Sequence, residues 1–286
     1  MNLEGGRILR EPFTHIIAPN LGLRIYPDRR PGNLEIAGIH KALVLVRGGK
    51  EIIEEGAGFG LPVVKYKDKT YFPGSAILTL LKSEPPPIVV KSYLLDTISI
   101  KSLGRSRISD TFYQPIHTTF ARFYLSLGKL RPIFDTLIKL RDTVGLRTNF
   151  EATTPRGKVD IIYTLYPDYV EISVSPYLDQ DFKELILLNE QGASTFRRYI
   201  DSSKQFIDRQ MGAWDRIDFN EATLSDLNGG LSFTVERPNG AGFWRGRESV
   251  RGKLSWAGLA LSFKNTEKIK YTIRIKSNDR DPEKTH

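Results

Sequence analysis

The chain has 286 residues, of which 40% are hydrophobic and 10% aromatic; this is enough for a substantial core and excludes a disordered polymer. Cysteine is absent, which excludes disulfides, thiolate nucleophiles and cysteine-ligated metals. The formal net charge of +9 favours anionic partners, but the basic residues are dispersed along the chain, as is typical of a solvated surface.

The N-terminal segment and the hydropathy of the chain indicate the cellular location of the protein. The first 13 residues, MNLEGGRILREPF, lack the uninterrupted apolar stretch of a secretory signal. No segment reaches the roughly 18 consecutive apolar residues that a membrane span needs. We therefore expect a cytoplasmic protein without a membrane partner.

Three early runs have the composition of β-strands: KALVLV at 41–46, LPVVKY at 61–66 and PIVVKSYLL at 87–95. The proline cluster at 83–90, SEPPPIVV, either separates two domains or stiffens a sheet edge or a crossover between sheets. Strand-like runs continue on both sides of it. We therefore predict one large β domain over 1–276, with a subdivision near 83–90 as the alternative, and a polar tail over 277–286.

The tetrapeptide GAGF occurs twice, at Gly56–Phe59 and at Gly240–Phe243. One such identity is expected by chance in a chain of this length, and the flanking residues share no pattern, so no duplication is indicated. The apolar residues after the first copy favour a structural bend or bulge. After the second copy, Arg245 and Arg247 follow Trp244 and either bind an anionic or carbohydrate ligand or belong to a solvated hairpin tip.

One segment has helical spacing. In LRPIFDTLIKLRDTV at 130–144, apolar residues recur every three or four positions, Pro132 suits the first turn and Gly145 can close the last turn. This pattern predicts one principal amphipathic helix. A second, poorer helical pattern covers 195–207.

The clearest strand pattern is KVDIIYTLYPDYVEISVS at 158–175. Apolar residues alternate on both sides of Pro167 and Asp168, which predicts a β-hairpin with one buried face. LSFTVE at 231–236, LSWAGLALSF at 254–263 and YTIRI at 271–275 repeat the alternation. Many short strands separated by turns predict a mainly β fold, a large antiparallel sandwich, with the helix at 130–144 laid against it.

Few side chains stand out as candidates for proton transfer. No two of the four histidines have a metal-ligand spacing, so we expect neither a metal nor a cofactor. His117, in FYQPIHTTF, lies between aromatic residues; it is the best candidate for proton transfer or else a hydrogen-bonded structural histidine. Asn189, Glu190 and Gln191 follow an apolar run and precede a glycine, so they can hydrogen-bond a polar substrate at a strand end.

Trp214 and Asp215 are adjacent in GAWDR. An indole beside a carboxylate can hold a sugar, with the apolar ring face on the indole and the hydroxyls on the acid. The same pair also occurs in capping arrangements. Asp215 is thus the alternative to Glu190 as the catalytic carboxylate, and Trp214 and Trp244 are candidate stacking faces.

The strand pair at 158–175 and the C-terminal runs at 254–263 and 271–275 resemble the central strands of the galactose-mutarotase-like supersandwich found in aldose epimerases. The resemblance is a pattern of strands and covers roughly the C-terminal half of the chain. It implies a sugar-acting protein in which a histidine acid and a glutamate base work across the sugar ring. His117 and Glu190 are the residues of this chain that would take those parts.

Two functions stay open at this point. The first is a carbohydrate-binding or carbohydrate-processing protein, epimerase-like or lyase-like, in which Arg247 meets an acidic substituent of the sugar. The second is a non-enzymatic module that binds nucleic acid or another polyanion through the basic stretch Arg245–Lys253. The lack of a contiguous basic stripe and the tryptophan–carboxylate pair favour the first. Whether the protein is an enzyme, and whether it forms oligomers, is left open by the sequence.

Overall fold

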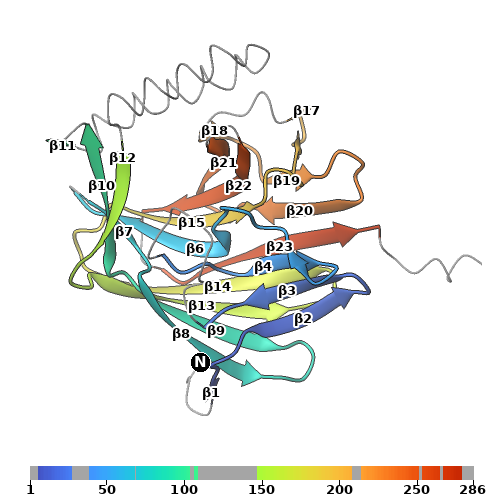
Figure 1. Cartoon of the computed structure of the whole chain (residues 1–286), viewed down its shortest axis with the longest axis horizontal. Coiled ribbons are helices and arrows are strands. Elements are labelled where there is room, and N and C mark those ends of the chain that lie inside the picture. The colour runs from blue at the N-terminus through green and yellow to red at the C-terminus, as the bar shows by residue number, and fades with distance from the viewer. Residues whose placement is uncertain are drawn as a thin grey trace, which may run out of the picture.

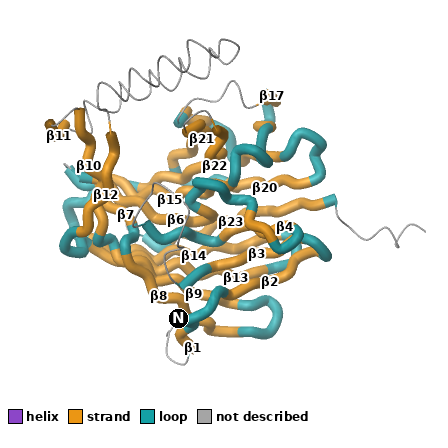
Figure 2. Tube along the Cα trace, in the orientation of Figure 1, coloured by secondary structure: helices purple, strands orange, loops and turns teal. Residues whose placement is uncertain are grey.

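The computed structural model describes residues 6–27, 39–67, 69–103, 106–108, 147–207, 214–250, 253–264 and 267–278. Every regular element in these ranges is a β-strand, drawn orange in Figure 2, so the mainly β prediction is confirmed. The principal helix expected at 130–144 and the candidate His117 lie outside the described residues. No helical segment of the described part has the length and hydropathy needed to span a bilayer.

The largest sheet has ten strands, and all of its neighbours pair antiparallel. In spatial order they are β1 (Arg7–Ile8), β8 (Ser75–Lys82), β9 (Ile88–Leu94), β13 (Gly157–Leu165), β14 (Tyr169–Leu178), β23 (Ile269–Ser277), β20 (Leu231–Glu236), β19 (Glu221–Ser225), β16 (Arg198–Ile200) and β17 (Gln205–Ile207).

The second sheet has nine strands. In spatial order they are β11 (Ser106–Ile108), β10 (Thr97–Leu103), β7 (Thr70–Phe72), β6 (Gly58–Lys65), β15 (Glu184–Gln191), β22 (Lys253–Phe263), β21 (Gly242–Val250) and β18 (Asp215–Ile217), with β12 (Arg147–Ala152) also paired to β10. A four-stranded sheet contains β2 (Phe13–Ala18), β3 (Leu21–Ile25), β4 (Val44–Arg47) and β5 (Lys50–Glu51).

The core lies between the two large sheets, which form the layers of a sandwich. In Figure 1, β6, β15 and β22 run above β14, β13 and β9. Phe59 of β6 meets Phe233 of β20 edge to face, with ring centroids 5.0 Å apart, so aromatic rings from the two sheets interlock. The antiparallel β-sandwich prediction is therefore confirmed for the described residues.

The hairpin predicted at 158–175 is β13 and β14, paired from Gly157 opposite Leu178 to Leu165 opposite Val170. Its alternating apolar side chains are all buried: Val159, Ile161, Tyr163, Leu165, Val170, Ile172 and Val174. Because successive side chains of a strand point to opposite faces, this single register buries the whole apolar set at once.

The two GAGF copies have different structures. In the first, Gly58 has φ +86°, and nearby Gly60 has φ +85° where the pairing of β6 with β15 shifts register between Leu188 and Asn189. The predicted bulge is thus confirmed. In the second copy it is Gly240 that has a positive φ, +77°, in a turn before β21. The repeat is a coincidence of sequence and not a repeated loop.

The weak helical pattern at 195–207 is wrong: this segment contains the strands β16 and β17. The connection between them is closed by Asp201, whose carboxylate accepts hydrogen bonds from the backbone N–H groups of Ser203 (2.8 Å) and Lys204 (2.9 Å). An aspartate that binds the backbone two and three residues onward favours a turn over a helix.

The proline cluster lies in the turn between β8 and β9, which pair with each other from Lys82 opposite Ile88 onward. At the C-terminus, Ser277 still belongs to β23, and Asn278 donates its backbone N–H to Gly230 at 2.8 Å. The rest of the expected polar tail, 279–286, lies outside the described residues. The single domain over 1–276 stays a prediction.

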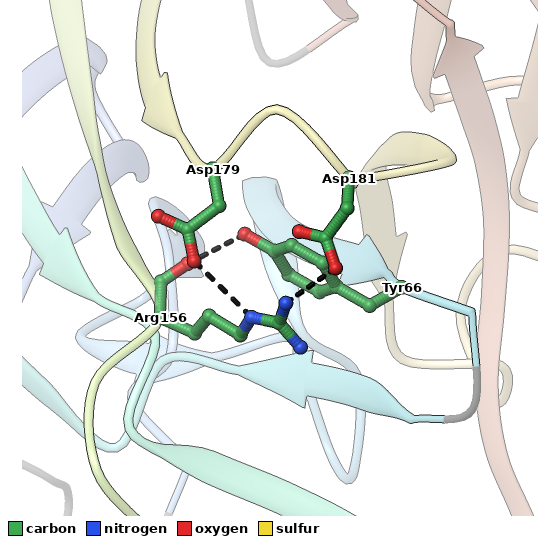
Figure 3. Close-up of polar contacts among 4 residues, drawn as sticks. All are labelled: Tyr66, Arg156, Asp179 and Asp181. Atoms are coloured by element: carbon green, nitrogen blue, oxygen red, sulfur yellow. Dashed lines mark hydrogen bonds and ion pairs between the residues drawn. The ribbon is translucent and has the colours of Figure 1, made fainter.

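One polar cluster ties the two large sheets together at the end of β6 (Figure 3). The Arg156 guanidinium lies over the Tyr66 ring, 4.4 Å from its centroid, and forms ion pairs with Asp179 (3.1 Å) and with Asp181. The Tyr66 hydroxyl donates to the Arg156 carbonyl at 2.5 Å. Burial raises the pKa of Tyr66 to about 12, so the hydroxyl stays protonated as a donor at neutral pH. We assign this cluster a structural role.

Candidate functional site

The strand register of β15, β22 and β21 defines two faces of the nine-stranded sheet. Phe243, Leu259 and Leu261 are fully buried and point into the sandwich. Since side chains alternate along a strand, Trp244, Gly246, Gly258 and Ala260 belong to the opposite, outer face. The candidate site is built on that outer face.

Two glycines face each other at the centre of this region. Gly246 of β21 is directly opposite Gly258 of β22, and Gly258 is directly opposite Glu190 of β15. A Cβ placed on Gly258 would lie 2.6 Å from the Glu190 Cγ, so the Glu190 side chain lies over the glycine. The close approach of the glutamate therefore requires glycine at position 258.

Tryptophans border the glycines on both sides along the strands. Trp244 is two residues before Gly246 and donates its indole N–H to the Ser262 hydroxyl at 3.1 Å. Trp256 is two residues before Gly258, and Trp214 stacks on it with ring centroids 4.9 Å apart and planes 23° from parallel. All three tryptophans of the chain thus belong to one face of one sheet.

Alternation along β15 points the two residues before Gln191 to opposite faces of the sheet. Asn189 points into the sandwich, where its Oδ1 accepts hydrogen bonds from the Tyr271 hydroxyl (2.9 Å) and the Gly60 N–H (3.0 Å). Glu190 therefore points outward, and its Oε2 accepts a hydrogen bond from the Ala57 N–H at 2.9 Å. With 5% of its surface exposed, Glu190 is a buried residue of this outer face.

Gln191, Arg245 and Arg247 belong to the inner face and are separated from the tryptophans by the sheet. Gln191 accepts a hydrogen bond from the Leu45 N–H at 3.3 Å. Arg247 is 1% exposed and donates to the Ala193 carbonyl at 3.0 Å. Burial, with a contribution from the neighbouring Arg197, lowers the pKa of Arg247 to about 9.

The Arg245 side chain lies between the sheets, near the edge of the sandwich. Its guanidinium carbon lies 4.6 Å from the Tyr199 ring centroid and 4.7 Å from that of Phe206, and an Nη atom lies 4.0 Å from the buried Asp201 carboxylate. The basic surface predicted for Arg245–Lys253 is therefore wrong at Arg245 and Arg247, which point between the sheets because they occupy inner positions of β21. Arg251 lies outside the described residues.

Asp215 is directly opposite Arg245 in the pairing of β18 with β21. Directly opposed residues share a face, so Asp215 belongs to the inner side, whereas Trp214 stacks on the outer side. The structure thus separates the sequence neighbours Trp214 and Asp215. It brings Trp214, Trp244 and Glu190 to one face, and the candidate His117 lies outside the described residues.

Sequence reasoning missed Trp256 and the two facing glycines. The signal was present in LSWAGLALSF, because alternation places Trp256, Gly258 and Ala260 on one face of a strand. What the sequence does not encode locally is that β21 and β15 flank this strand and bring Gly246 and Glu190 beside it. In the described part of the chain, no three His, Asp or Glu side chains gather as metal ligands.

No protein-family model and no curated protein matches the sequence. Among solved structures, a 4-alpha-glucanotransferase from Thermococcus litoralis aligns over 95% of this chain with a TM-score of 0.43 and 8% identity. The chain spans 39% of the length of that enzyme.

Two further solved structures match along nearly their full length. A protein described as an aldose 1-epimerase from Escherichia coli aligns with a TM-score of 0.40 and 9% identity, over 95% of this chain and 99% of its own. A galactose mutarotase-related enzyme from Lactobacillus acidophilus aligns with a TM-score of 0.32 and 9% identity, over 93% and 97%.

Proposed function

We propose that the protein binds a carbohydrate on the outer face of the nine-stranded sheet. The observation that supports this proposal is the gathering of all three tryptophans and one carboxylate around the facing glycines Gly246 and Gly258. An indole face suits the apolar C–H face of a sugar ring, and a carboxylate suits its hydroxyls. Because Gly258 has no side chain, the Glu190 side chain can lie close to the sheet.

In this proposal the half-buried Trp214 and Trp244 provide the contact surface, and Glu190 accepts hydrogen bonds from sugar hydroxyls. The inner positions of Arg245 and Arg247 argue against the alternative polyanion-binding module, because phosphate contacts need exposed cations. They also remove Arg247 as the partner of an acidic substituent. The proposal is therefore for a carbohydrate, with no requirement that it be acidic.

The binding proposal is tested by Trp214→Ala, which removes a half-buried indole that stacks on Trp256. We expect affinity for any sugar that the wild type binds to fall at least about tenfold, as loss of a stacking face should cause. Isothermal titration with D-glucose, D-galactose and D-galacturonate measures this. Tyr177→Ala is the matched control, since Tyr177 is an exposed aromatic residue of the other large sheet. Equal losses in both variants would contradict the assigned face.

The proposal extends to proton transfer by Glu190, with His117 as its expected counterpart. Glu190→Gln keeps the size of the side chain and an oxygen that can accept from the Ala57 N–H. We expect turnover of a bound sugar to fall roughly 100-fold, because the proton-transfer step loses its base, and its affinity to fall about tenfold, because a charged hydrogen-bond acceptor becomes neutral. Anomer exchange followed by NMR is the measurement. Unchanged turnover in this variant would remove Glu190 from the catalytic role and leave the binding role.

A further inference from the structure

The Glu190 carboxylate is held by the backbone segment that leads into β6, the strand paired with β15. Residues 52–57 lie across the end of β15, where Ala57 donates its N–H to the Glu190 carboxylate at 2.9 Å and Gly192 donates its N–H to the Ile52 carbonyl at 2.8 Å. A Cβ on Gly56 would lie 3.2 Å from the Gln191 carbonyl oxygen, so the segment packs directly on the β15 backbone.

Lys41 binds this same segment. Its Nζ donates to the Gly56 carbonyl at 2.8 Å and to the Glu54 carbonyl at 3.1 Å. The Gly56 carbonyl and the Ala57 N–H belong to one peptide group, which is planar and trans. The lysine ammonium and the Glu190 carboxylate are therefore bound to opposite ends of a single peptide unit.

Such an arrangement couples the two charges. A cation on a peptide oxygen polarises the C–N bond and strengthens the donation from the peptide N–H to an anion, an effect that grows where water is excluded. Because the peptide is rigid, fixing its oxygen also fixes the direction of its N–H, and with it the position of the Glu190 Oε2.

The rest of the segment is built to hold this geometry. Glu54 has a positive φ, +48°, which is unfavourable for a residue with a side chain and persists only where surrounding contacts impose it. Its Oε1 accepts hydrogen bonds from the backbone N–H of Ser194 (3.2 Å) and from the Ser194 hydroxyl. On the other side, the fully buried Lys91 donates from its Nζ to the Lys41 carbonyl at 2.7 Å.

We propose that Lys41 is a positioning residue for the carbohydrate site, acting on Glu190 through the Gly56–Ala57 peptide. The effect of Lys41 on sugar binding rests on the proposed function, whereas its coupling to Glu190 through the peptide does not. Lys41 contacts no sugar in this scheme; it fixes the direction and strength of the hydrogen bond that holds the Glu190 carboxylate.

The test uses the full chain and the variants Lys41→Met and Lys41→Arg. Lys41→Met removes the cation and the hydrogen-bond donor, whereas Lys41→Arg keeps both. Affinity for the bound sugar of the D-glucose, D-galactose and D-galacturonate panel is expected to fall about tenfold in Lys41→Met, as for loss of a hydrogen bond to a charged group, and to recover in Lys41→Arg. Lys65→Met is the matched control, since Lys65 pairs with Glu184 on the rim of the same sheet.

The Ala57 amide signal in a ¹H–¹⁵N spectrum reports on the peptide without any sugar. We expect it to move upfield in Lys41→Met and in Glu190→Gln, and to return towards its wild-type position in Lys41→Arg. An amide that moves in Glu190→Gln but not in Lys41→Met would overturn the inference, even if sugar binding is confirmed. If the amide moves as expected but no sugar binds, the coupling through the peptide stands and the proposed function fails.

Discussion

Replacing Asn189 by leucine is expected to lower the free energy of unfolding by about 3–5 kcal/mol. Asn189 is fully buried, and its Oδ1 accepts from both the Tyr271 hydroxyl and the Gly60 N–H. Leucine has a similar volume but accepts no hydrogen bond, so two buried donors lose their partner at a cost of about 1–3 kcal/mol each. Urea denaturation followed by circular dichroism measures the change at a constant m-value.

Tyr271→Phe is the matched control for this prediction. It removes only one of the two donors and leaves Asn189 bound to the Gly60 N–H, so we expect a loss of about 1 kcal/mol. If Asn189→Leu cost no more than Tyr271→Phe, the bulge at Gly60 would not depend on the asparagine.

The second large effect is expected from Gly58→Ala, at about 2–4 kcal/mol of stability. Gly58 has φ +86°, a region that costs a residue with a side chain about 1–2 kcal/mol. A Cβ there would also lie 2.9 Å from the Ala42 carbonyl carbon and 2.9 Å from the Leu43 carbonyl oxygen. Both are backbone atoms that cannot rotate away, so overpacking adds to the conformational cost. Thermal or urea unfolding measures the sum.

Gly240→Ala separates the two contributions. Gly240 has φ +77° in the other GAGF copy, but a Cβ there meets no atom within 4 Å. We expect this variant to lose only about 1 kcal/mol, from the backbone conformation alone. Equal losses at Gly58 and Gly240 would show that close approach of the Ala42–Leu43 backbone does not constrain the bulge.

The strands of this protein were predictable from the sequence because their signal is local. The alternation in 158–175 identifies both strands, their turn and their buried side chains, and β13 and β14 confirm each of these. Likewise, apolar residues after Gly60 indicate a strand whose glycines bend the backbone, as β6 does. A period of two residues depends on neighbours in the chain and needs no knowledge of the fold.

The site was only partly predictable, because its geometry depends on which strands become neighbours. Glu190, Gly258 and Gly246 come from three strands whose order in the sheet no local pattern specifies. The same missing information led to the wrong placement of Arg245 and Arg247: clustered cations beside a tryptophan resemble a binding surface, but alternate positions of β21 point into the sandwich. A charge cluster on a strand has two faces, and only the register tells which one is exposed.

The most direct test of the carbohydrate site uses the three tryptophans as reporters, since each gives one indole N–H signal in a ¹H–¹⁵N spectrum. The protein is titrated with D-glucose, D-galactose and D-galacturonate while binding is followed in parallel by calorimetry. The account predicts that a sugar that binds shifts the Trp214 and Trp244 signals, saturating at the calorimetric Kd. Saturable binding that leaves all three indole signals in place, or no binding by any sugar of the panel, would contradict it.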